Sequence, residues 1–398
     1  MDLRPAEKIV ISPEVPGELA HKITHVFDTC IDCPKCHAEC AFLARYGTPR
    51  EIVAAGDLTD PEFLTIAYEC SLCGLCGAVC PVGLKPEALF LEMRRAAVKA
   101  GKGPLKQHAT LLAYEKRGTS RRYTYYSFPA GCRTVFFPGC TLPGTRPTQT
   151  RAIYEHLKKH RPNLGIVLDC CSKPSHDLGC QDLFLTRFME MKAYLVRNGI
   201  QKVAVACPNC YHVFSRYGKP LEVISIYEML LDTELPASSS IPENCLITIH
   251  DPCVLRDETE IQQSVRKLSK KIGFSIIEMR HAGKKTMCCG EGGAVECVES
   301  RLPNIWRNRR KEEASGRRMV TYCAGCANSL KKVTPVSHIL DAIIDPHAAM
   351  AGCSPVSSPP FTYLNRLRLK RQLKKNDTAL VTRERHGTDL SAKSMSNK

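Results

Sequence analysis

Two runs of cysteines near the N-terminus share one spacing. Two, two and three residues separate the cysteines of each run, and proline follows the second: Cys30, Cys33, Cys36 and Cys40, then Cys70, Cys73, Cys76 and Cys80-Pro81. Such a loop points three thiolates at three irons of a 4Fe-4S cube, and a remote cysteine closes the fourth corner. Because the run occurs twice, the sequence predicts two cubane 4Fe-4S clusters.

The remote fourth cysteine determines which thiolates share a cluster. We expect one cluster to be held by Cys30, Cys33, Cys36 and Cys80, and the other by Cys70, Cys73, Cys76 and Cys40. A pair of zinc knuckles is the alternative, and the complete spacing, present twice, disfavours it.

Helix signals surround both runs. Thr48-Pro49-x-Glu51 is a capping box with proline at the first helical position, and Asp60-Pro61 and Lys85-Pro86 open two further helices. We therefore expect a helical ferredoxin domain over 1–104.

A basic linker over 105–132 is expected to follow. It alternates arginine with tyrosine over 121–126, a composition that could stack on single-stranded nucleic acid. No recognisable nucleic-acid module accompanies it, so no nucleic-acid partner is expected.

From Arg133 onward the sequence alternates short apolar runs with helical patterns, and each cysteine group follows a predicted strand. The pattern occurs twice, and each cysteine group begins 30 and 36 positions after the preceding one ends in the first half, and 35 and 34 positions after it in the second. This is an internal duplication. It predicts an α+β multidomain chain whose two α/β halves, 133–234 and 243–345, have mostly parallel sheets.

Each half brings five cysteines to one edge of its predicted sheet, the carboxyl edge at which such folds bind ligands. Five thiolates exceed the needs of one zinc ion, which favours an iron–sulfur cluster of unusual shape. The pair Cys288-Cys289 is expected near the end of a strand over 274–279, and Gly290 lets the chain turn there. In the first half Ser172 takes the place of that glycine, which restricts the turn.

The order Cys, Cys-Cys-Gly, Cys-x2-Cys, repeated behind two ferredoxin motifs, resembles the cysteine-rich CCG domain of the heterodisulfide reductase family in a fused form. The iron–sulfur subunits of anaerobic glycerol-3-phosphate, glycolate and lactate dehydrogenases are similar. The resemblance covers roughly 28–333.

The resemblance implies that each five-cysteine set holds a non-cubane 4Fe-4S cluster, so that one or two such clusters are expected, and that a disulfide substrate is split between the sets. Carried over residue by residue, the sets are Cys140, Cys170, Cys171, Cys207 and Cys210, and Cys253, Cys288, Cys289, Cys323 and Cys326.

Three residues beside these cysteines are candidates for catalysis. His250 and Asp251 could donate protons to a leaving thiolate, and hydrogen bonding that fixes the Cys253 turn is the equal alternative. Glu291 is placed similarly, with helix capping as its alternative.

Electrons must reach this chain from another protein. The stretch Gly290-Glu291-Gly292-Gly293 lacks the third glycine of a dinucleotide fingerprint, since position 295 is valine. The expected partner is a flavoprotein, a hydrogenase or a membrane cytochrome of anaerobic metabolism. Two functions remain open: reduction of a disulfide-type substrate, or electron delivery from a flavin-dependent dehydrogenase to a quinone pool.

The net charge of +16 gathers in 99–133 and in the tail. The tail, 346–398, is expected to be basic and partly disordered, and Phe361, Leu364 and Leu367 among its basic residues could form an amphipathic helix for a partner or a membrane surface. The alternative is a solvated tail.

No run approaches about 18 consecutive apolar residues, and the N-terminus lacks a signal-peptide core. We expect a cytoplasmic protein, with peripheral contact at the inner face of the membrane.

Overall fold

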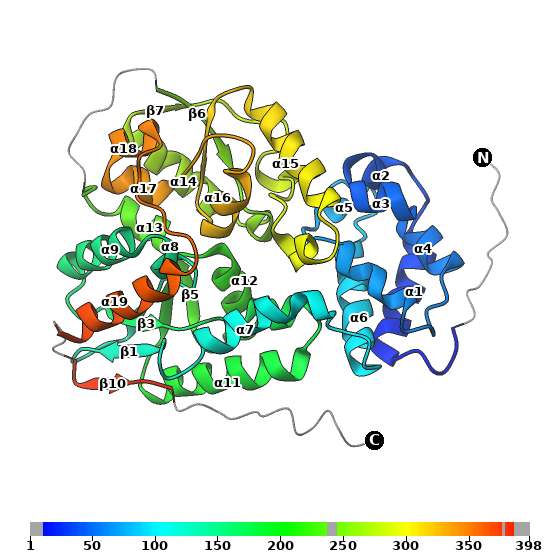
Figure 1. Cartoon of the computed structure of the whole chain (residues 1–398), viewed down its shortest axis with the longest axis horizontal. Helices are drawn as coiled ribbons and strands as arrows, with labels where there is room; N and C mark the ends of the chain where they lie inside the picture. The colour runs from blue at the N-terminus through cyan, green and yellow to red at the C-terminus, as the bar shows by residue number, and fades with distance from the viewer. Residues whose placement is uncertain (1–10, 237–244, 376–378, 386–398) are drawn as a thin grey trace.

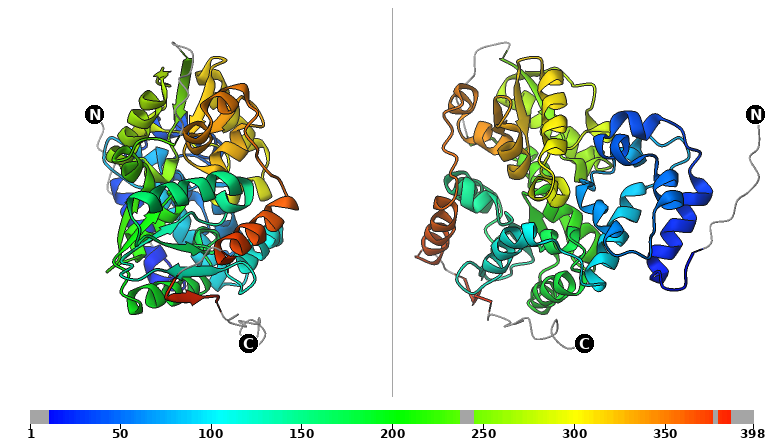
Figure 2. Two further views of the ribbon diagram at one scale, coloured as in Figure 1. Left: turned by 90° about the vertical axis from the view of Figure 1, so that its left-hand side faces the viewer. Right: turned by 45° about the vertical axis from the view of Figure 1, so that its right-hand side comes forward.

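The computed structural model describes residues 11–236, 245–375 and 379–385. The N-terminal helices form a lobe on one side, and two sheets with their helices form the larger body (Figure 1). The further views in Figure 2 show the helical lobe against both sheet-containing halves. A helical N-terminal region followed by duplicated α/β halves was predicted, and this fold class is confirmed.

The N-terminal lobe consists of short helices around the cysteine loops. They are α1 (Gly17–Thr29), α2 (Lys35–Glu39), α3 (Ala41–Tyr46), α4 (Pro49–Ala55), η1 (Phe63–Glu69), α5 (Leu75–Ala78) and α6 (Pro86–Lys99). The predicted capping box is present, because the Glu51 N–H donates to Thr48 Oγ1 and the Thr48 N–H donates to the Glu51 carboxylate. The helix expected from Asp60 is instead a 3₁₀-helix over Phe63–Glu69.

The first half is built on a six-stranded sheet in the order β10-β1-β3-β2-β4-β5. Its parallel strands are β2 (Thr134–Phe137), β3 (Gly165–Leu168), β4 (Lys202–Val205) and β5 (Glu222–Ser225). The helices are α8 (Leu142–Thr145), α9 (Pro147–His160), α10 (Lys173–Asp177), α11 (Gln181–Arg197), α12 (Pro208–Tyr217) and α13 (Ile226–Leu231). Since β3 is buried along its whole length, it is a central strand of the kind that βαβ units produce.

The remaining two strands of this sheet come from the predicted linker and the predicted tail. Helices η2 (Lys106–His108) and α7 (Ala109–Gly118) lead into β1 (Tyr125–Phe128), which pairs antiparallel with both β3 and β10 (Val381–Arg383). Tyr125 and Tyr126 are buried in this strand. The 105–132 segment therefore completes the first half, and its buried tyrosines face the core.

The tail also differs from the expectation over its described residues. Helix α19 (Phe361–Lys375) packs on α8 and α9, with Leu369 buried and the Asn365 amide donating to the Gly144 carbonyl at 3.0 Å. Arg385 pairs with buried Asp169 at 3.3 Å, which holds the end of β10 against the sheet. Disorder was predicted beyond Asn376, but β10 (Val381–Arg383) pairs with β1 within that range, while 376–378 and 386–398 lie outside the described residues.

The second half has a four-stranded, fully parallel sheet in the order β7-β6-β8-β9. The strands are β6 (Cys245–His250), β7 (Phe274–Ile276), β8 (Arg318–Thr321) and β9 (Val336–His338). The helices are η3 (Cys253–Leu255), α14 (Thr259–Ile272), η4 (Gly283–Lys285), η5 (Gly292–Cys297), α15 (Arg301–Ala314), α16 (Ala324–Leu330), α17 (Ile339–Ile344) and α18 (Pro346–Ala351).

The strand predicted over 274–279 ends early. As an edge strand, β7 is held by β6 alone, and the last contact is the Ile277 N–H to the Ile247 carbonyl at 2.9 Å. The chain then leaves the sheet, and the Gly283 N–H donates to the Asp251 carboxylate at 2.7 Å. A loop, rather than the strand end itself, therefore delivers Cys288 and Cys289.

One apolar core joins the two halves, since Ile153 and Leu157 of α9 belong to the same cluster as Ile339 and Leu340 of α17. At its edge the Arg146 guanidinium donates to both carboxylate oxygens of Asp341 at 2.9 and 3.0 Å, and both side chains are buried. This pair connects the first half to the second.

Removing one partner of this pair is expected to be costly. Asp341→Ala leaves the Arg146 charge buried without its partner, so we expect the free energy of unfolding to fall by about 3–5 kcal/mol, measured by denaturant titration. The control is Glu155→Ala, which breaks the exposed pair between Arg151 and Glu155 and is expected to cost less than about 1 kcal/mol. Equal losses in the two variants would contradict this prediction.

Candidate iron–sulfur sites

The structure brings the thiols of Cys30, Cys33, Cys36 and Cys80 together at the outer side of the N-terminal lobe. The charges of the other three act on Cys36, and all four line a pocket of about 320 Å³. Burial is the main cause that raises the pKa of Cys36 to about 11.

The thiols of Cys40, Cys70, Cys73 and Cys76 form a second group, because the charges of the other three act on Cys76. Burial raises the pKa of Cys40 to about 12 and that of Cys70 well above its ordinary value. Buried thiols with raised pKa values ionise when a metal binds them. A set of four such thiols fits a cubane 4Fe-4S cluster.

The two cysteine loops turn in the same way. Asp32 and Leu72, each two residues after the first cysteine of its run, have positive φ angles of 52° and 53°. Few side chains adopt this left-handed conformation, so its occurrence at equivalent positions shows that both loops fold around their thiols alike.

Two buried arginines attach the second loop to the rest of the protein. Arg256 of the second half donates from Nε to the Cys73 carbonyl at 3.0 Å and from another guanidinium nitrogen to the Thr286 carbonyl, also at 3.0 Å. Arg94 of α6 is fully buried and donates to four carbonyls. These belong to Ala67 and Cys70 in the lobe, Asp177 in the first half and Gly293 in the second.

This attachment places the Cys73 thiol beside the second half. The charge of Cys288 acts on Cys73, and the charge of Cys73 acts on Cys253. The group containing Cys73 therefore lies between the outer thiol group and the five cysteines of the second half.

The five cysteines of each half form a row of hydrogen-bonded thiols. In the first half the order is Cys140, Cys170, Cys171, Cys210 and Cys207. In the second half it is Cys253, Cys288, Cys289, Cys326 and Cys323. The two orders are equivalent under the internal duplication, so both halves present the same arrangement of soft donors to a metal cluster.

The serine in the first half does not prevent the turn that follows the cysteine pair. Ser172 has φ 58° and Gly290 has φ 91°, so both residues are left-handed. A left-handed L-residue costs about 1–2 kcal/mol, and the first half bears this cost while keeping all five thiols together.

A pocket of about 330 Å³ lies between the two rows. Both halves line it, with Thr141, Leu142, Ala206, Cys207 and Asn209 from the first, and Glu291, Cys323, Ala324, Gly325 and His338 from the second. Cys207 and Cys323 are end members of their rows, so each row reaches the same pocket.

Glu291 presents its carboxyl to this pocket. The side chain is open to the pocket, yet the protein around it desolvates the carboxyl, and this burial, followed by the charges of Cys288 and Glu296, raises the pKa of Glu291 to about 7. A carboxyl in such surroundings can carry a proton near neutral pH.

Asp251 and His250 differ in their surroundings. Both Asp251 oxygens already accept hydrogen bonds, from Arg266 at 2.9 and 3.0 Å and from the Tyr322 hydroxyl at 2.9 Å. Burial opposes ionisation of Asp251, but Arg266 outweighs it and the pKa is lowered. This geometry favours the interpretation that Asp251 fixes the turn before Cys253.

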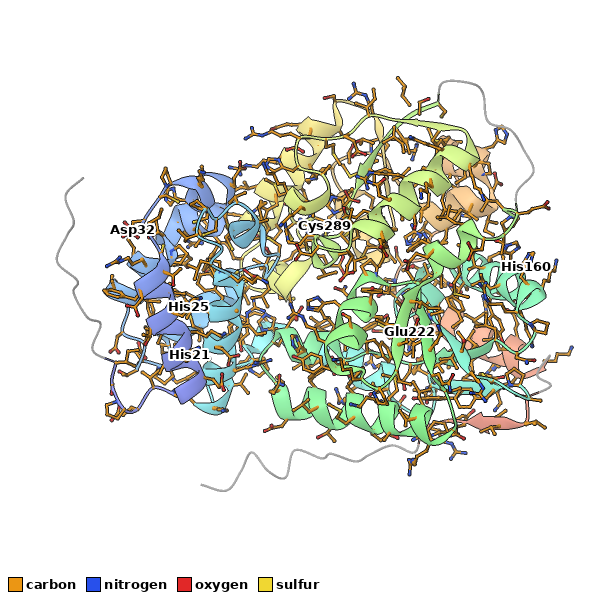
Figure 3. The ribbon with its side chains drawn as sticks, turned by 180° about the vertical axis from the view of Figure 1, so that it is seen from behind. His21, His25, Asp32, His160, Glu222 and Cys289 are labelled. Atoms are coloured by element: carbon orange, nitrogen blue, oxygen red, sulfur yellow. The ribbon has the colours of Figure 1, made fainter. Side chains whose placement is uncertain are left out.

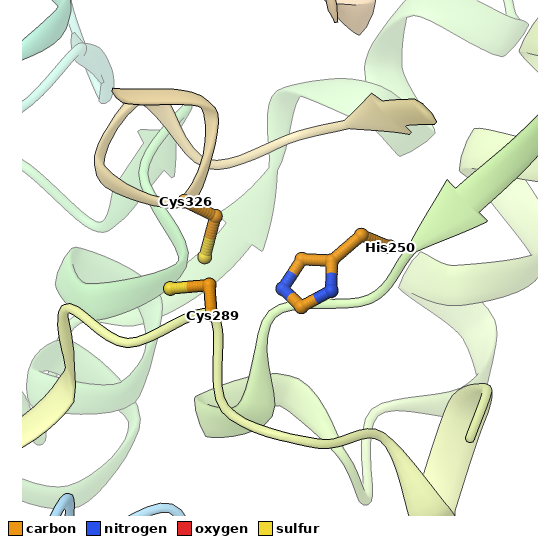
Figure 4. Close-up of side chains that lie close together, drawn as sticks. All are labelled: His250, Cys289 and Cys326. Atoms are coloured by element: carbon orange, nitrogen blue, oxygen red, sulfur yellow. The ribbon is translucent and has the colours of Figure 1, made fainter. Parts of the chain in front are cut away.

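His250 points instead at the second row. A ring nitrogen and the thiols of Cys289 and Cys326 lie within 4.8 Å of one another, and Figure 4 shows the imidazole facing both cysteines. Burial, followed by the charge of Arg310, lowers the pKa of His250 to about 3, so the imidazole is neutral. Figure 3 shows Cys289 in the interior, toward the N-terminal helices, with Glu222 farther from them.

Models of two known protein families match this chain, one over the N-terminal cysteine loops and one over the two five-cysteine halves. Residues 26–84 match the 4Fe-4S dicluster domain, and residues 134–215 and 247–331 match the cysteine-rich domain. The chain belongs to the iron–sulfur proteins that join these domains. This iron–sulfur protein thus carries the ferredoxin motifs and the duplicated cysteine-rich domain within one polypeptide.

Two relatives match more than half of the iron–sulfur protein. A fumarate reductase (CoM/CoB) subunit of Methanothermobacter marburgensis is 27% identical over 345 residues, which cover 76% of this chain and 67% of the relative. A dihydromethanophenazine:CoB–CoM heterodisulfide reductase subunit of Methanosarcina barkeri is 25% identical over 264 residues, covering 59% and 64%. The chain thus spans about two thirds of the length of these relatives.

A third relative matches a smaller part. EtfAB:quinone oxidoreductase of Syntrophomonas wolfei is 29% identical over 142 residues, which cover 34% of this chain and 20% of the relative. Among the described residues of the iron–sulfur protein, no helix is long and apolar enough to cross a membrane.

Sequence patterns located the cysteines but missed the arginines that join the domains. Arg94 and Arg256 are two of 56 basic residues, and nothing in their spacing distinguishes them. His338, which lines the pocket, was missed for the same reason. His176 and His212 are expected to support the ligands from behind or to lie at the surface, and His176 bonds to Asp177 at 2.8 Å and Tyr217 at 3.0 Å.

Proposed function

We propose that this iron–sulfur protein relays electrons from a redox partner through two cubane clusters to the pocket between its halves, where a disulfide-type substrate is reduced. The observation that carries this proposal is the pocket itself, because Cys207 of one thiol row and Cys323 of the other both line it. A substrate there would lie between two metal groups. The likeness to a heterodisulfide reductase subunit of Methanosarcina barkeri supports the same chemistry.

The order in space of the four cysteine sets supports electron flow from the outer side of the lobe toward the pocket. The group of Cys30 lies at the outer side of the lobe and faces a pocket flanked by Ile31 and Val82, whose exposed fractions are 60% and 41%. The group of Cys73 comes next and adjoins Cys288 of the second row. We infer that a flavoprotein, hydrogenase or membrane cytochrome docks at the outer group and that electrons enter the pocket through the second half.

Reduction of a disulfide breaks one S–S bond and consumes two electrons and two protons to give two thiols. Iron–sulfur clusters, when bound by the two cysteine sets of the lobe and by the two thiol rows, supply the electrons. The chain's own part is to orient the substrate and to hold protons. Glu291 is the residue we assign to proton donation, because its carboxyl faces the pocket and its surroundings favour the protonated form.

Glu291→Gln is expected to lower disulfide turnover by about 10²-fold, because the amide keeps the shape of the side chain but cannot donate a carboxyl proton. Turnover would be measured with a reduced viologen as electron source, alongside the iron content of each preparation. Glu222→Gln, at the start of β5, exposed and outside the pocket lining, is the control and is expected to match the parent. A Glu291→Gln chain with parental turnover and parental iron content would remove Glu291 from the mechanism.

The function itself is tested on anaerobically purified full-length protein. Iron and sulfide analysis is expected to give about eight irons for the two cubane clusters and about four to eight more for the cysteine-rich halves. Reduced viologen is expected to drive reduction of a heterodisulfide by the isolated chain. A preparation containing no more than a zinc equivalent, or a fully loaded one that reduces no disulfide, would overturn the proposal.

A second candidate is electron delivery to a quinone pool without substrate chemistry in the chain. The likeness to part of EtfAB:quinone oxidoreductase favours it, as does the exposed face of α19, where Phe361 and Leu364 are 61% and 45% exposed beside basic residues. Peripheral contact with an anionic membrane would use this face. Co-purification with a flavoprotein and no viologen-driven disulfide reduction would support this candidate over the first.

A further inference from the structure

The two halves, though duplicated, are not identical where their first strands end. In the first half Phe137 of β2 pairs in register with Val205 of β4, and in the second His250 of β6 pairs with Thr321 of β8. Phe137 and His250 each stand three residues before the first cysteine of their row. His250 and Phe137 are therefore equivalent positions, and only the second half has a nitrogen donor there.

His250 is buried without a conventional partner. It has no exposed surface, and neither ring nitrogen has a hydrogen-bond partner among the described residues. A buried polar group left without a partner costs about 1–3 kcal/mol, so such a group in a folded protein calls for an explanation. The groups that its ring faces are the thiols of Cys289 and Cys326 (Figure 4).

We propose that His250 is a sixth donor of the second thiol row and binds, through one imidazole nitrogen, the iron–sulfur cluster that Cys289 and Cys326 help to hold. The inference deepens the proposed function and rests on it only in requiring a cluster in this row. Imidazole nitrogen and thiolate sulfur are both ordinary ligands of iron in proteins. A bound nitrogen also removes the cost of the unpartnered ring.

The first half offers no such donor. Phe137 packs edge-on against Phe214, with ring centroids 5.3 Å apart, and lies in an apolar cluster with Cys171 and Cys210. The two clusters would therefore differ electronically although their five thiols match. Where histidine replaces thiolate in iron–sulfur centres the reduction potential rises. His250 would instead add a neutral donor to a row that keeps all five thiolates, so the two clusters are expected to differ in reduction potential.

The test needs no substrate and begins with the unaltered chain. Full-length protein is produced with ¹⁵N-labelled histidine, purified anaerobically, partly reduced and measured by pulsed electron paramagnetic resonance. We expect a nitrogen hyperfine coupling of the strength typical of iron-bound imidazole, which changes from a ¹⁴N to a ¹⁵N pattern on labelling. The proposal would be overturned if the coupling were absent, or if it were as weak as the coupling that a hydrogen bond to sulfur produces.

The His250→Phe variant then tests whether His250 gives this signal. It introduces the residue that the first half carries at the equivalent position. The coupling is expected to vanish and one reduction potential to shift, with iron content unchanged. His212→Gln, two residues after Cys210 of the first row, is the matched control and is expected to keep the coupling. The inference would be overturned if the coupling persisted in His250→Phe or was lost in His212→Gln. It would also be overturned if two cubane clusters accounted for all the iron in the unaltered chain.

Failure of this inference and failure of the proposed function give different results. A chain with the nitrogen coupling but no disulfide turnover retains His250 as a ligand and loses the reductase function. A chain that reduces the disulfide but lacks the coupling retains the reductase function and loses His250 as a ligand.

Discussion

The Cys289→Ser chain is expected to lose disulfide reduction completely and to contain about four fewer irons than the parent. Cys289 stands in the middle of the second row, hydrogen-bonded to Cys288 on one side and Cys326 on the other. Serine keeps the size of the side chain but replaces a soft thiolate with a hydroxyl that stays protonated, so the cluster loses a central ligand. Iron analysis, electron paramagnetic resonance and viologen-driven turnover measure the outcome.

Two further variants show whether the effect belongs to the second row. Cys171→Ser removes the equivalent thiol of the first row, and we expect a smaller loss of turnover there because the second row adjoins Cys73. Cys297→Ser changes an exposed cysteine outside the row and is expected to leave iron and turnover unaltered. An unchanged spectrum for Cys289→Ser together with a lost signal for Cys171→Ser would reverse the ranking of the two halves.

Arg94→Ala is expected to lower the free energy of unfolding by about 3–5 kcal/mol. Alanine removes the Arg94 donor from the carbonyls of Cys70, Asp177 and Gly293, and each such group costs about 1–3 kcal/mol before the structure relaxes, whereas the Ala67 carbonyl still accepts from the Cys70 N–H. Since these carbonyls belong to the lobe and to both halves, the variant is also expected to loosen the lobe and slow electron transfer to the second half. Denaturant titration and the rate of cluster reduction through the chain measure the two effects.

The conservative variant separates charge from geometry. Arg94→Lys keeps the positive charge but lacks the planar fork that reaches four carbonyls, so we expect it to recover only part of the stability. Arg95→Ala removes the next residue of the same helix, which forms a half-buried pair with Glu92 at 2.6 Å, and is expected to cost less than Arg94→Ala because it breaks one ion pair rather than four hydrogen bonds. If the free energy of unfolding of Arg94→Ala equalled that of the parent, the carbonyls would have found other donors.

Much of the protein could be predicted from local patterns. The capping box at Thr48 and the helix opened by Lys85-Pro86 depend on residues close together in sequence, and both are present as expected. The duplication was visible because cysteines are rare and their intervals repeat. The strand expected over 274–279 was too long, because its apolar residues do not reveal that β7 has only one neighbour to pair with.

The sequence by itself determined the donor set: which thiols exist, how short loops group them, and that two similar halves follow a helical iron–sulfur domain. These properties follow from spacing along the chain, which is fixed by covalent bonds. Only the tertiary structure decided that the two rows border one pocket, that Arg94 and Arg256 set the Cys73 group beside the second half, and that His250 faces Cys289 where the first half has phenylalanine. These contacts join residues far apart in sequence, and they depend on how the sheets, helices and lobe pack together, which no local pattern encodes.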